Sequence, residues 1–201
     1  MLPSTAPSDS LKAPSTIRTK AWAEPPTANP SSSAKTPPEN SLTSPPKFTF
    51  VIDSLGKTSY GDGLAFFIAP KGYQYPFVAV EFDIFQNQVT SVQDPAGDHV
   101  GIDVDSTKSL ITKPWNGSVV NGAINSARVS YHSGSKTLSV AYTSYVNGAQ
   151  VMRYLDYTVD LNQYLPDWVI VGFSAGTGAL TAMHKINSWS FDSTSLVEDK
   201  F

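Results

Sequence analysis

An abrupt change of composition at Lys47 limits how much of this chain can fold into a compact domain. Ten of the fifteen prolines lie within residues 1–46, mixed with Ser, Thr and Ala. Such a segment cannot bury enough apolar surface to offset its loss of conformational entropy. We therefore expect residues 1–46 to be disordered and residues 47–201 to form one domain. A proline-rich docking ligand is the alternative for the first segment, but no PxxP stretch with basic flanks stands out.

The rest of the chain has the pattern of an all-β protein. No window from Phe48 onward keeps a helical period for more than a turn or two, and turn-forming residues separate short apolar segments. Strands are predicted at 47–53, 63–69, 77–85, 99–105, 126–132, 137–145, 154–161, 168–175 and 184–192. Asn147-Gly148 suits a tight hairpin turn. Because segments 64–68 and 169–173 are apolar on both faces, we expect two stacked antiparallel sheets.

Charge and composition exclude several classes of partner and site. A net charge of -3 offers no basic field for a phosphate backbone, so we expect no nucleic-acid partner. No apolar run approaches the roughly 18 to 20 residues that cross a bilayer, so we expect no membrane span. The absence of cysteine excludes disulfides and thiolate metal sites. Residues 1–17 do not have the pattern of a secretory signal peptide.

Acidic and amide side chains gather on one face of the predicted strand at 77–85. Strand side chains alternate between faces, so four residues share the face opposite an apolar one: Glu81, Asp83, Phe85 and Asn87. Two carboxylates at this spacing repel each other unless a cation or base lies between them. With Asp94 and His99 downstream, the set suits Ca²⁺ together with Mn²⁺ or a similar ion. A lone pair of acids on a strand is usually solvated surface, but the joint pattern favours a metal site.

Longer stretches around these residues match a known pattern. They are VAVEFDIFQN at 78–87, DPAGDHVGIDVDS at 94–106 and GDGLAFFIAP at 61–70, with further matches at 160–168, 171–178 and 187–191. In this order they resemble legume lectins over residues 47–193. The resemblance implies a concanavalin-like jelly-roll sandwich and a non-enzymatic protein whose partners are glycans or glycoproteins. It also implies an extracellular or vacuolar location.

The resemblance also assigns the metal ligands. Mn²⁺ or a similar ion is implied at four side chains: Glu81, Asp83, Asp94 and His99. Ser109 would orient a water on that ion. Calcium is implied at Asp83, Asp94, the Asn87 side chain and the Phe85 backbone carbonyl. Both metals would be structural, and calcium would fix the loop that presents Asn87.

Five residues are implied at the sugar site: Asp62, Phe85, Asn87, Ala179 and Leu180. The Asp62 carboxylate can accept two hydroxyl donors of a hexose. In the family this aspartate follows a cis peptide bond, and Gly61 stands here in place of the usual alanine. Asn87 would donate an amide hydrogen, and Phe85 would offer a ring face. The loop with Ala179 and Leu180 has the short form of mannose and glucose binders, which favours those sugars over galactose.

The chain departs from the family pattern in three places. The connection 71–76 is shorter than the family's glycine-rich loop, and its two tyrosines could either stack on a sugar or pack locally. The interval from Asn87 to Asp94 is longer than expected. The family's first strands are missing, so we expect an N-terminally incomplete sandwich with unpaired sheet edges and uncovered apolar surface. A homo-oligomer is possible.

Other readings of the sequence remain open. One is a lectin-like defence or storage protein, or a truncated inactive homologue, that no longer binds sugar. Another is a glycosidase similar to β-glucanases, which is less favoured because Phe85 and Gln86 occupy the places where a second catalytic acid would follow Asp83. Asn116-Gly117-Ser118 is a candidate glycosylation site.

Overall fold

A computed structural model describes residues 47–70, 76–89, 92–166 and 169–191. The predicted disordered segment 1–46 lies outside the described residues. So do residues 71–75, which include the two tyrosines of the short connection, and the chain end from 192 onward.

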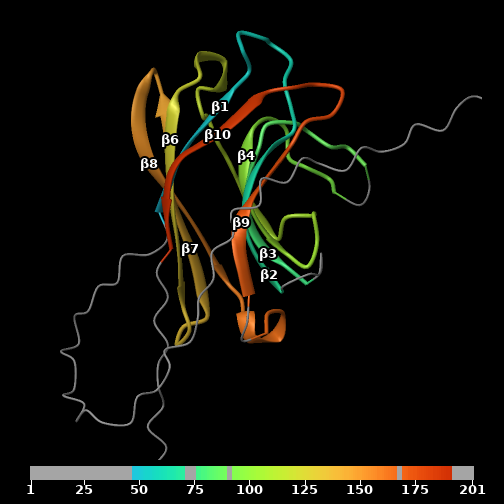
Figure 1. Cartoon of the computed structure of the whole chain (residues 1–201), viewed down its shortest axis with the longest axis vertical. Helices are drawn as coiled ribbons and strands as arrows, with labels where there is room; N and C mark the ends of the chain where they lie inside the picture. The colour runs from blue at the N-terminus through green and yellow to red at the C-terminus, as the bar shows by residue number, and fades with distance from the viewer. Residues whose placement is uncertain (1–46, 71–75, 90–91, 167–168, 192–201) are drawn as a thin grey trace, which may run out of the picture.

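The described residues form two stacked five-stranded sheets (Figure 1). One sheet has the order β10-β1-β6-β7-β8, and the other has the order β5-β4-β3-β2-β9. The first contains β1 (Lys47–Asp53), β6 (Ile124–His132), β7 (Thr137–Val146), β8 (Ala149–Thr158) and β10 (Met183–Ser190). The second contains β2 (Gly63–Pro70), β3 (Val78–Asp83), β4 (His99–Val104), β5 (Ile111–Pro114) and β9 (Val169–Gly176). Every pairing is antiparallel, which confirms the predicted sandwich.

Aromatic side chains fill the space between the sheets. Phe82 on β3 is fully buried, and its ring lies 4.6 Å from that of Phe50 and 5.1 Å from that of Trp115. The Trp115 indole N–H donates to the carbonyl of Thr143 on β7 over 2.9 Å, so a buried hydrogen bond joins the two sheets. Aromatic pairs at these separations add to the free energy of apolar burial. This core holds the faces of β3 and β4 in place.

Most predicted strands agree with the structure to within two residues at each end, but the bounds predicted for one strand are wrong. The segment predicted at 154–161 is β8, which runs from Ala149 to Thr158. Asn147 and Gly148 have φ values of 51° and 77°, the positive values of a tight hairpin turn. The ladder between β7 and β8 therefore starts at Val146 and Ala149, directly after the turn, although the first residues of β8 are mostly exposed.

Some elements were not predicted at all. They are the short strand β5 and two 3-10 turns, η1 (Val119–Asn121) and η2 (Leu161–Gln163). Within the part of the chain that the structure describes, no helix is long and apolar enough to cross a membrane.

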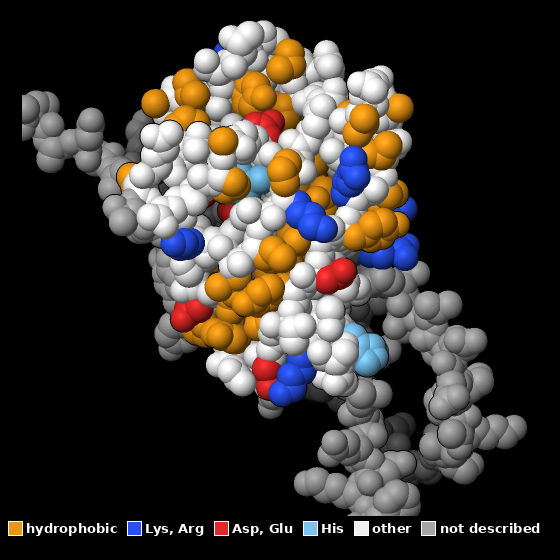
Figure 2. Space-filling model, turned by 180° about the vertical axis from the view of Figure 1, so that it is seen from behind, with side chains coloured by type: hydrophobic (Ala, Val, Ile, Leu, Met, Phe, Trp, Pro, Cys, Tyr) orange, Lys and Arg blue, Asp and Glu red, His pale blue; other side chains and the backbone are white. Residues whose placement is uncertain are grey.

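Four strands stand at the ends of the sheets: β5, β8, β9 and β10. Each pairs on one side only within the described residues. Large exposed apolar side chains include Ile124, Val146, Met152 and Tyr154, on β6, β7 and β8. On the face seen from behind, hydrophobic side chains are interspersed with Lys, Arg and polar groups (Figure 2). The described surface therefore carries both apolar and charged groups.

Candidate metal and sugar site

The pairing of β3 with β4 brings the predicted metal ligands together. Asp83 lies opposite His99 and Glu81 lies opposite Gly101, so these side chains share one face of the sheet. The ligand atoms of Glu81, Asp83 and His99 all lie within 4.8 Å of one another. The alternation of side chains on β3 and on β4, together with this register, therefore brings two carboxylates and an imidazole together.

His99 is the clearest sign that this cluster suits a cation. Its side chain is 1% exposed, and Nδ1 lies 3.2 Å from the carbonyl of Gly97. If Nδ1–H donates to that carbonyl, Nε2 presents a lone pair. Nε2 is buried without a hydrogen-bond partner, 3.7 Å from Glu81 Oε1 and 4.0 Å from Asp83 Oδ2. Burial lowers the pKa of His99, but its contacts with Glu81 and Asp83 raise it overall, so a metal would bind this nitrogen by displacing its proton. An imidazole nitrogen that faces two carboxylates fits the donor set of a divalent transition metal.

The pKa of Asp83 agrees with this interpretation. Burial, together with the charges of Glu81 and Asp94, raises this pKa from the ordinary value of 3.8 to about 7. The Phe85 N–H, which donates to Asp83 Oδ1 over 2.7 Å, and the charge of His99 act in the opposite direction. Without a cation, the two carboxylates are therefore not easily ionised together.

Asp103 belongs to this cluster and was not predicted. It is 4% exposed on β4, and Ser109 Oγ contacts both Asp103 Oδ1, at 2.6 Å, and Glu81 Oε1. Burial, together with the nearby charge of Glu81, raises the pKa of Asp103 to about 8. Because a hydroxyl has only one hydrogen to donate, a protonated Asp103 would satisfy the second contact of Ser109. The signal in the sequence is the alternation of His99, Gly101 and Asp103 on one face of β4.

Gly101 provides the room for these contacts. A Cβ at this position would lie 2.6 Å from Glu81 Oε1 and still closer to Ser109 Oγ. Both distances are shorter than real Cβ contacts. Because Gly101 has no side chain, the side chains of Glu81 and Ser109 can meet above β4 at this position.

The structure places Asp94 differently from the other three predicted transition-metal ligands. Its Oδ2 accepts from the Asn87 N–H over 2.6 Å, and its own N–H donates to the Asn87 carbonyl over 3.0 Å. These two bonds close the long interval between the two residues. Asp94 still raises the pKa of Asp83 through its charge, so it lies beside the cluster rather than within the group of three.

Asp62 lies where the ends of β9 and β3 meet. Its N–H donates to the carbonyl of Gly176 over 3.0 Å, and its carbonyl accepts from the Ile84 N–H over 2.9 Å. The Gly61-Asp62 bond is cis, as the resemblance implies. The carboxylate is half-buried, and burial raises its pKa. Asp62 is therefore held by backbone contacts from two strands.

Two neighbours border the Asp62 carboxylate. A Cβ on Gly61 would lie 3.2 Å from Phe85 Cβ and 3.3 Å from ring carbons, so the absence of a side chain lets the Phe85 side chain pack closely. A Cβ on Gly178 would lie 3.4 Å from Asp62 Oδ2. The Gly178 N–H donates to the Leu180 carbonyl over 3.0 Å, which folds the loop with Ala179 and Leu180 beside Asp62.

The candidate glycosylation site lies on a described turn. Asn116 is exposed, and its side-chain oxygen accepts the Ser118 N–H over 2.9 Å. Its side chain is therefore accessible on the surface between β5 and η1.

Comparison with known proteins gives one consistent result. The family model described as "Legume lectin domain" matches residues 71–200. "Lectin 7" of Medicago truncatula is 38% identical over 176 residues, which cover 73% of this chain and 65% of that protein. The chain thus spans less than two thirds of the length of this relative.

Comparison with solved structures also finds legume lectins. Basic winged bean lectin with Tn-antigen is 36% identical, with a TM-score of 0.63, and the match covers 72% of this chain and 68% of that chain. Lectin UEA-II complexed with galactose is 32% identical, with a TM-score of 0.63 and coverage of 72% and 69%.

These relatives are named as lectins. The match of the family model, the shared sandwich and the sequence identity all lead to the same assignment. This chain belongs to the legume lectin family.

Proposed function

We propose that this chain binds a hexose of a glycan at the end of β3, with Asp62 as the main contact and with the neighbouring metal cluster as its support. The observation that carries the proposal is the buried Nε2 of His99, which faces Glu81 and Asp83 without a hydrogen-bond partner. Leaving such a buried group unpaired costs about 1 to 3 kcal/mol. A cation offsets that cost and the repulsion between the two carboxylates.

Glu81, Asp83 and His99 would hold a transition metal such as Mn²⁺. Asp83, Asp94, the Asn87 side chain and the Phe85 carbonyl would hold Ca²⁺. When bound, the ions would supply positive charge that keeps these carboxylates ionised and the connected loop ordered. The contacts of Asp94 with the Asn87 backbone already join the two ends of that loop.

Side chains of the protein itself would make the contacts with the sugar. The half-buried Asp62 carboxylate would accept hydrogen bonds from two adjacent hydroxyls. Phe85, packed on Gly61, would face the C–H surface of the ring, and Asn87 would donate from its amide. The loop at Ala179 and Leu180 would border the ring. Its short form supports a preference for mannose or glucose, whereas two solved relatives are in complex with Tn-antigen and galactose.

Calorimetry with methyl α-mannoside and methyl α-galactoside tests the proposal, before and after EDTA. We expect saturable binding of the mannoside that EDTA abolishes and that Asp62→Asn weakens by at least about tenfold, since a charged acceptor is lost. Asp156→Asn on the exposed face of β8 is the matched control and should bind normally. Metal uptake without heat from either sugar would instead support a lectin-like protein that no longer binds sugar. Galactoside binding alone would refute the mannose preference but keep the lectin.

A further inference from the structure

A lysine lies against the loop that borders the proposed sugar site. The end of β1 pairs with the start of β10, so the segment after β1 (54–60) and the segment before β10 (177–182) lie side by side (Figure 1). Lys57 Nζ in the first segment donates to Thr181 Oγ1 in the second over 2.7 Å. The positive charge of Lys57 is therefore held at the loop beside Asp62.

The backbone around Lys57 holds this residue in a fixed turn. The Lys57 N–H donates to the Ser54 carbonyl over 3.2 Å, and the Ser54 hydroxyl donates to the Lys57 carbonyl over 2.8 Å. Ser54 is fully buried, and its N–H donates to the Val119 carbonyl over 3.1 Å, which ties the turn to η1. A lysine on a turn that is already ordered loses less freedom on binding an anion than one on a free loop.

The path along the loop from Asp62 to Lys57 is short. Asp62 Oδ2 would lie 3.4 Å from a Cβ on Gly178, and Thr181 follows Gly178 by three residues. Three residues span at most about 11 Å when fully extended. The hydrogen bond from the Gly178 N–H to the Leu180 carbonyl shortens this path. A hexose at Asp62 would therefore leave Lys57 near the next sugar residue of the same glycan.

No carboxylate of the described residues neutralises Lys57. It is the one charged residue in the segments 54–61 and 174–183, and it takes part in no ion pair within the described ranges. Its ammonium has three hydrogens and gives one to Thr181. The hydroxyl hydrogen of Thr181 meets no acceptor among the residues that the structure describes. An ammonium and a hydroxyl are therefore available to the two oxygens of one carboxylate.

We propose that Lys57 and Thr181 select acidic glycans, by binding the carboxylate of a sugar that is linked to the hexose at Asp62. This inference rests on the proposed sugar binding and adds the class of glycan. A neutral neighbouring sugar offers only hydroxyls, whose hydrogen bonds are weaker than those of a carboxylate with an ammonium. The acid belongs on the neighbouring sugar, because a carboxylate on the hexose itself would be repelled by Asp62.

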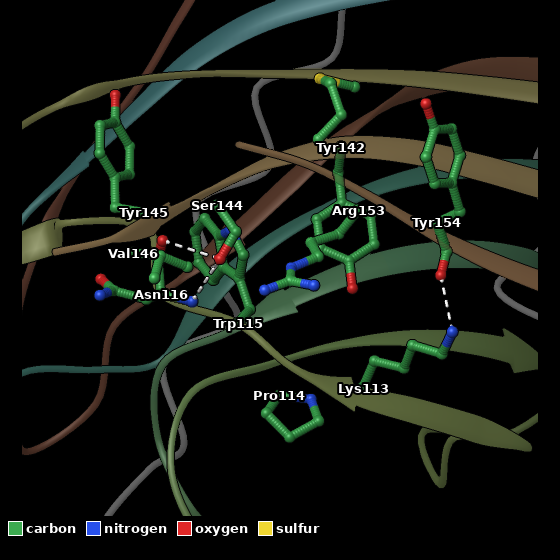
Figure 3. Close-up of a pocket in the computed structure, with 11 residues that line it drawn as sticks. Lys113, Pro114, Trp115, Asn116, Tyr142, Ser144, Tyr145, Val146, Arg153 and Tyr154 are labelled. Atoms are coloured by element: carbon green, nitrogen blue, oxygen red, sulfur yellow. Dashed lines mark hydrogen bonds between the residues drawn. The ribbon is translucent and has the colours of Figure 1, made fainter. Parts of the chain in front are cut away.

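Lys113 is a matched lysine away from this loop. Its Nζ donates to the Tyr154 carbonyl over 2.9 Å, across the gap between β5 and β8 (Figure 3). Strand β5 is the end strand of its sheet, and β4 and β3 separate it from β2, which begins directly after Asp62. Lys113 thus has one donor engaged, as Lys57 has, but at the far edge of the sheet.

Calorimetry with the full 201-residue chain, in excess Ca²⁺ and Mn²⁺, compares two glucosides that differ in one group. Maltobionate and maltitol both carry a terminal glucose, and the open second residue ends in a carboxylate in the first and in an alcohol in the second. Lactobionate and lactitol replace them if the chain binds galactose. We expect the acid to bind about threefold to tenfold more tightly than the alcohol. Higher salt should narrow this difference.

Lys57→Gln should remove most of the preference for the acid and leave binding of the alcohol unchanged, whereas Lys113→Gln should bind both as the unchanged chain does. Thr181→Val removes the contact with the loop but keeps the charge, so it should retain part of the preference. Equal affinities for acid and alcohol in the unchanged chain would overturn the selection by Lys57 and leave sugar binding at Asp62 intact.

Two other results would also overturn the proposal. If Lys57→Gln weakens binding of the alcohol as much as binding of the acid, the lysine only holds the loop in place. Equal losses in Lys57→Gln and Lys113→Gln would mean that position does not matter. If the unchanged chain binds none of the four compounds, sugar binding and the selection of acids are refuted together.

Discussion

Replacing Gly101 by alanine should damage the metal cluster although it replaces none of the proposed ligands. The new Cβ would start 2.6 Å from Glu81 Oε1, so this oxygen must move by about 0.8 Å to reach the 3.4 Å of ordinary contact. Ser109 Oγ must move further. Forcing an extra carbon into a packed site costs about 1 to 3 kcal/mol of unfolding free energy. Because Glu81 is displaced from His99, affinity for Mn²⁺ should also fall about 10-fold to 100-fold.

Two measurements separate these effects. Urea unfolding in EDTA gives the stability of the metal-free protein, and calorimetry with Mn²⁺ gives the affinity. Gly134→Ala is the matched control, since a Cβ there would meet only the exposed His132 imidazole, at 3.1 Å, which can turn aside. The reasoning is refuted if Gly101→Ala and Gly134→Ala have the same stability and the same affinity for Mn²⁺.

Three further predictions follow from single groups. Burial raises the pKa of Asp83 to about 7 and that of Asp103 to about 8, so the folded, metal-free protein holds protons that the unfolded chain releases above about pH 4. The unfolding free energy of the metal-free protein should therefore fall between pH 4 and pH 8, and it should fall less in Asp103→Asn. Urea titrations in EDTA at several pH values measure this change, and a rise in the unfolding free energy over this range would contradict the prediction. Trp115→Phe removes the donor to the buried Thr143 carbonyl and should lower the unfolding free energy by about 2 to 3 kcal/mol, measured by the same titration, whereas no change would mean that this bond contributes nothing. Gly148→Ala, at a φ of 77°, should cost about 1 kcal/mol in thermal unfolding, and an unchanged midpoint would contradict the assigned turn.

The strands were predictable because their signals are local. Apolar alternation and turn residues marked β1 to β4 and β9, and Asn147-Gly148 marked the hairpin between β7 and β8. The first half of β8 was missed because Ala149 to Arg153 carry little apolar pattern, and the ladder with β7 alone keeps them extended. Pairing in space, rather than composition, determines such a segment.

The site was predictable only in part, for a similar reason. Glu81 and Asp83 share a face by strand periodicity, and His99 joins them because β4 pairs with β3 in this register. The role of Asp103 depends on a contact through Ser109, which lies after the end of β4 and has no local signal. The placement of Asp94 depends on how a long loop closes, and periodicity says nothing about loop closure.

The order of strands in the sheets has a consequence for how the molecule forms. Two groups of neighbouring strands pair locally, β2 to β5 in one sheet and β6 to β8 in the other. In contrast, β1 pairs with β10 and β2 pairs with β9, which join opposite ends of the described chain. Contacts over such long sequence separations slow folding, because a large loop must close before they form. During synthesis the two local groups can assemble early, whereas β1 must wait for β10, the last of the described strands to be made, before its second edge is paired.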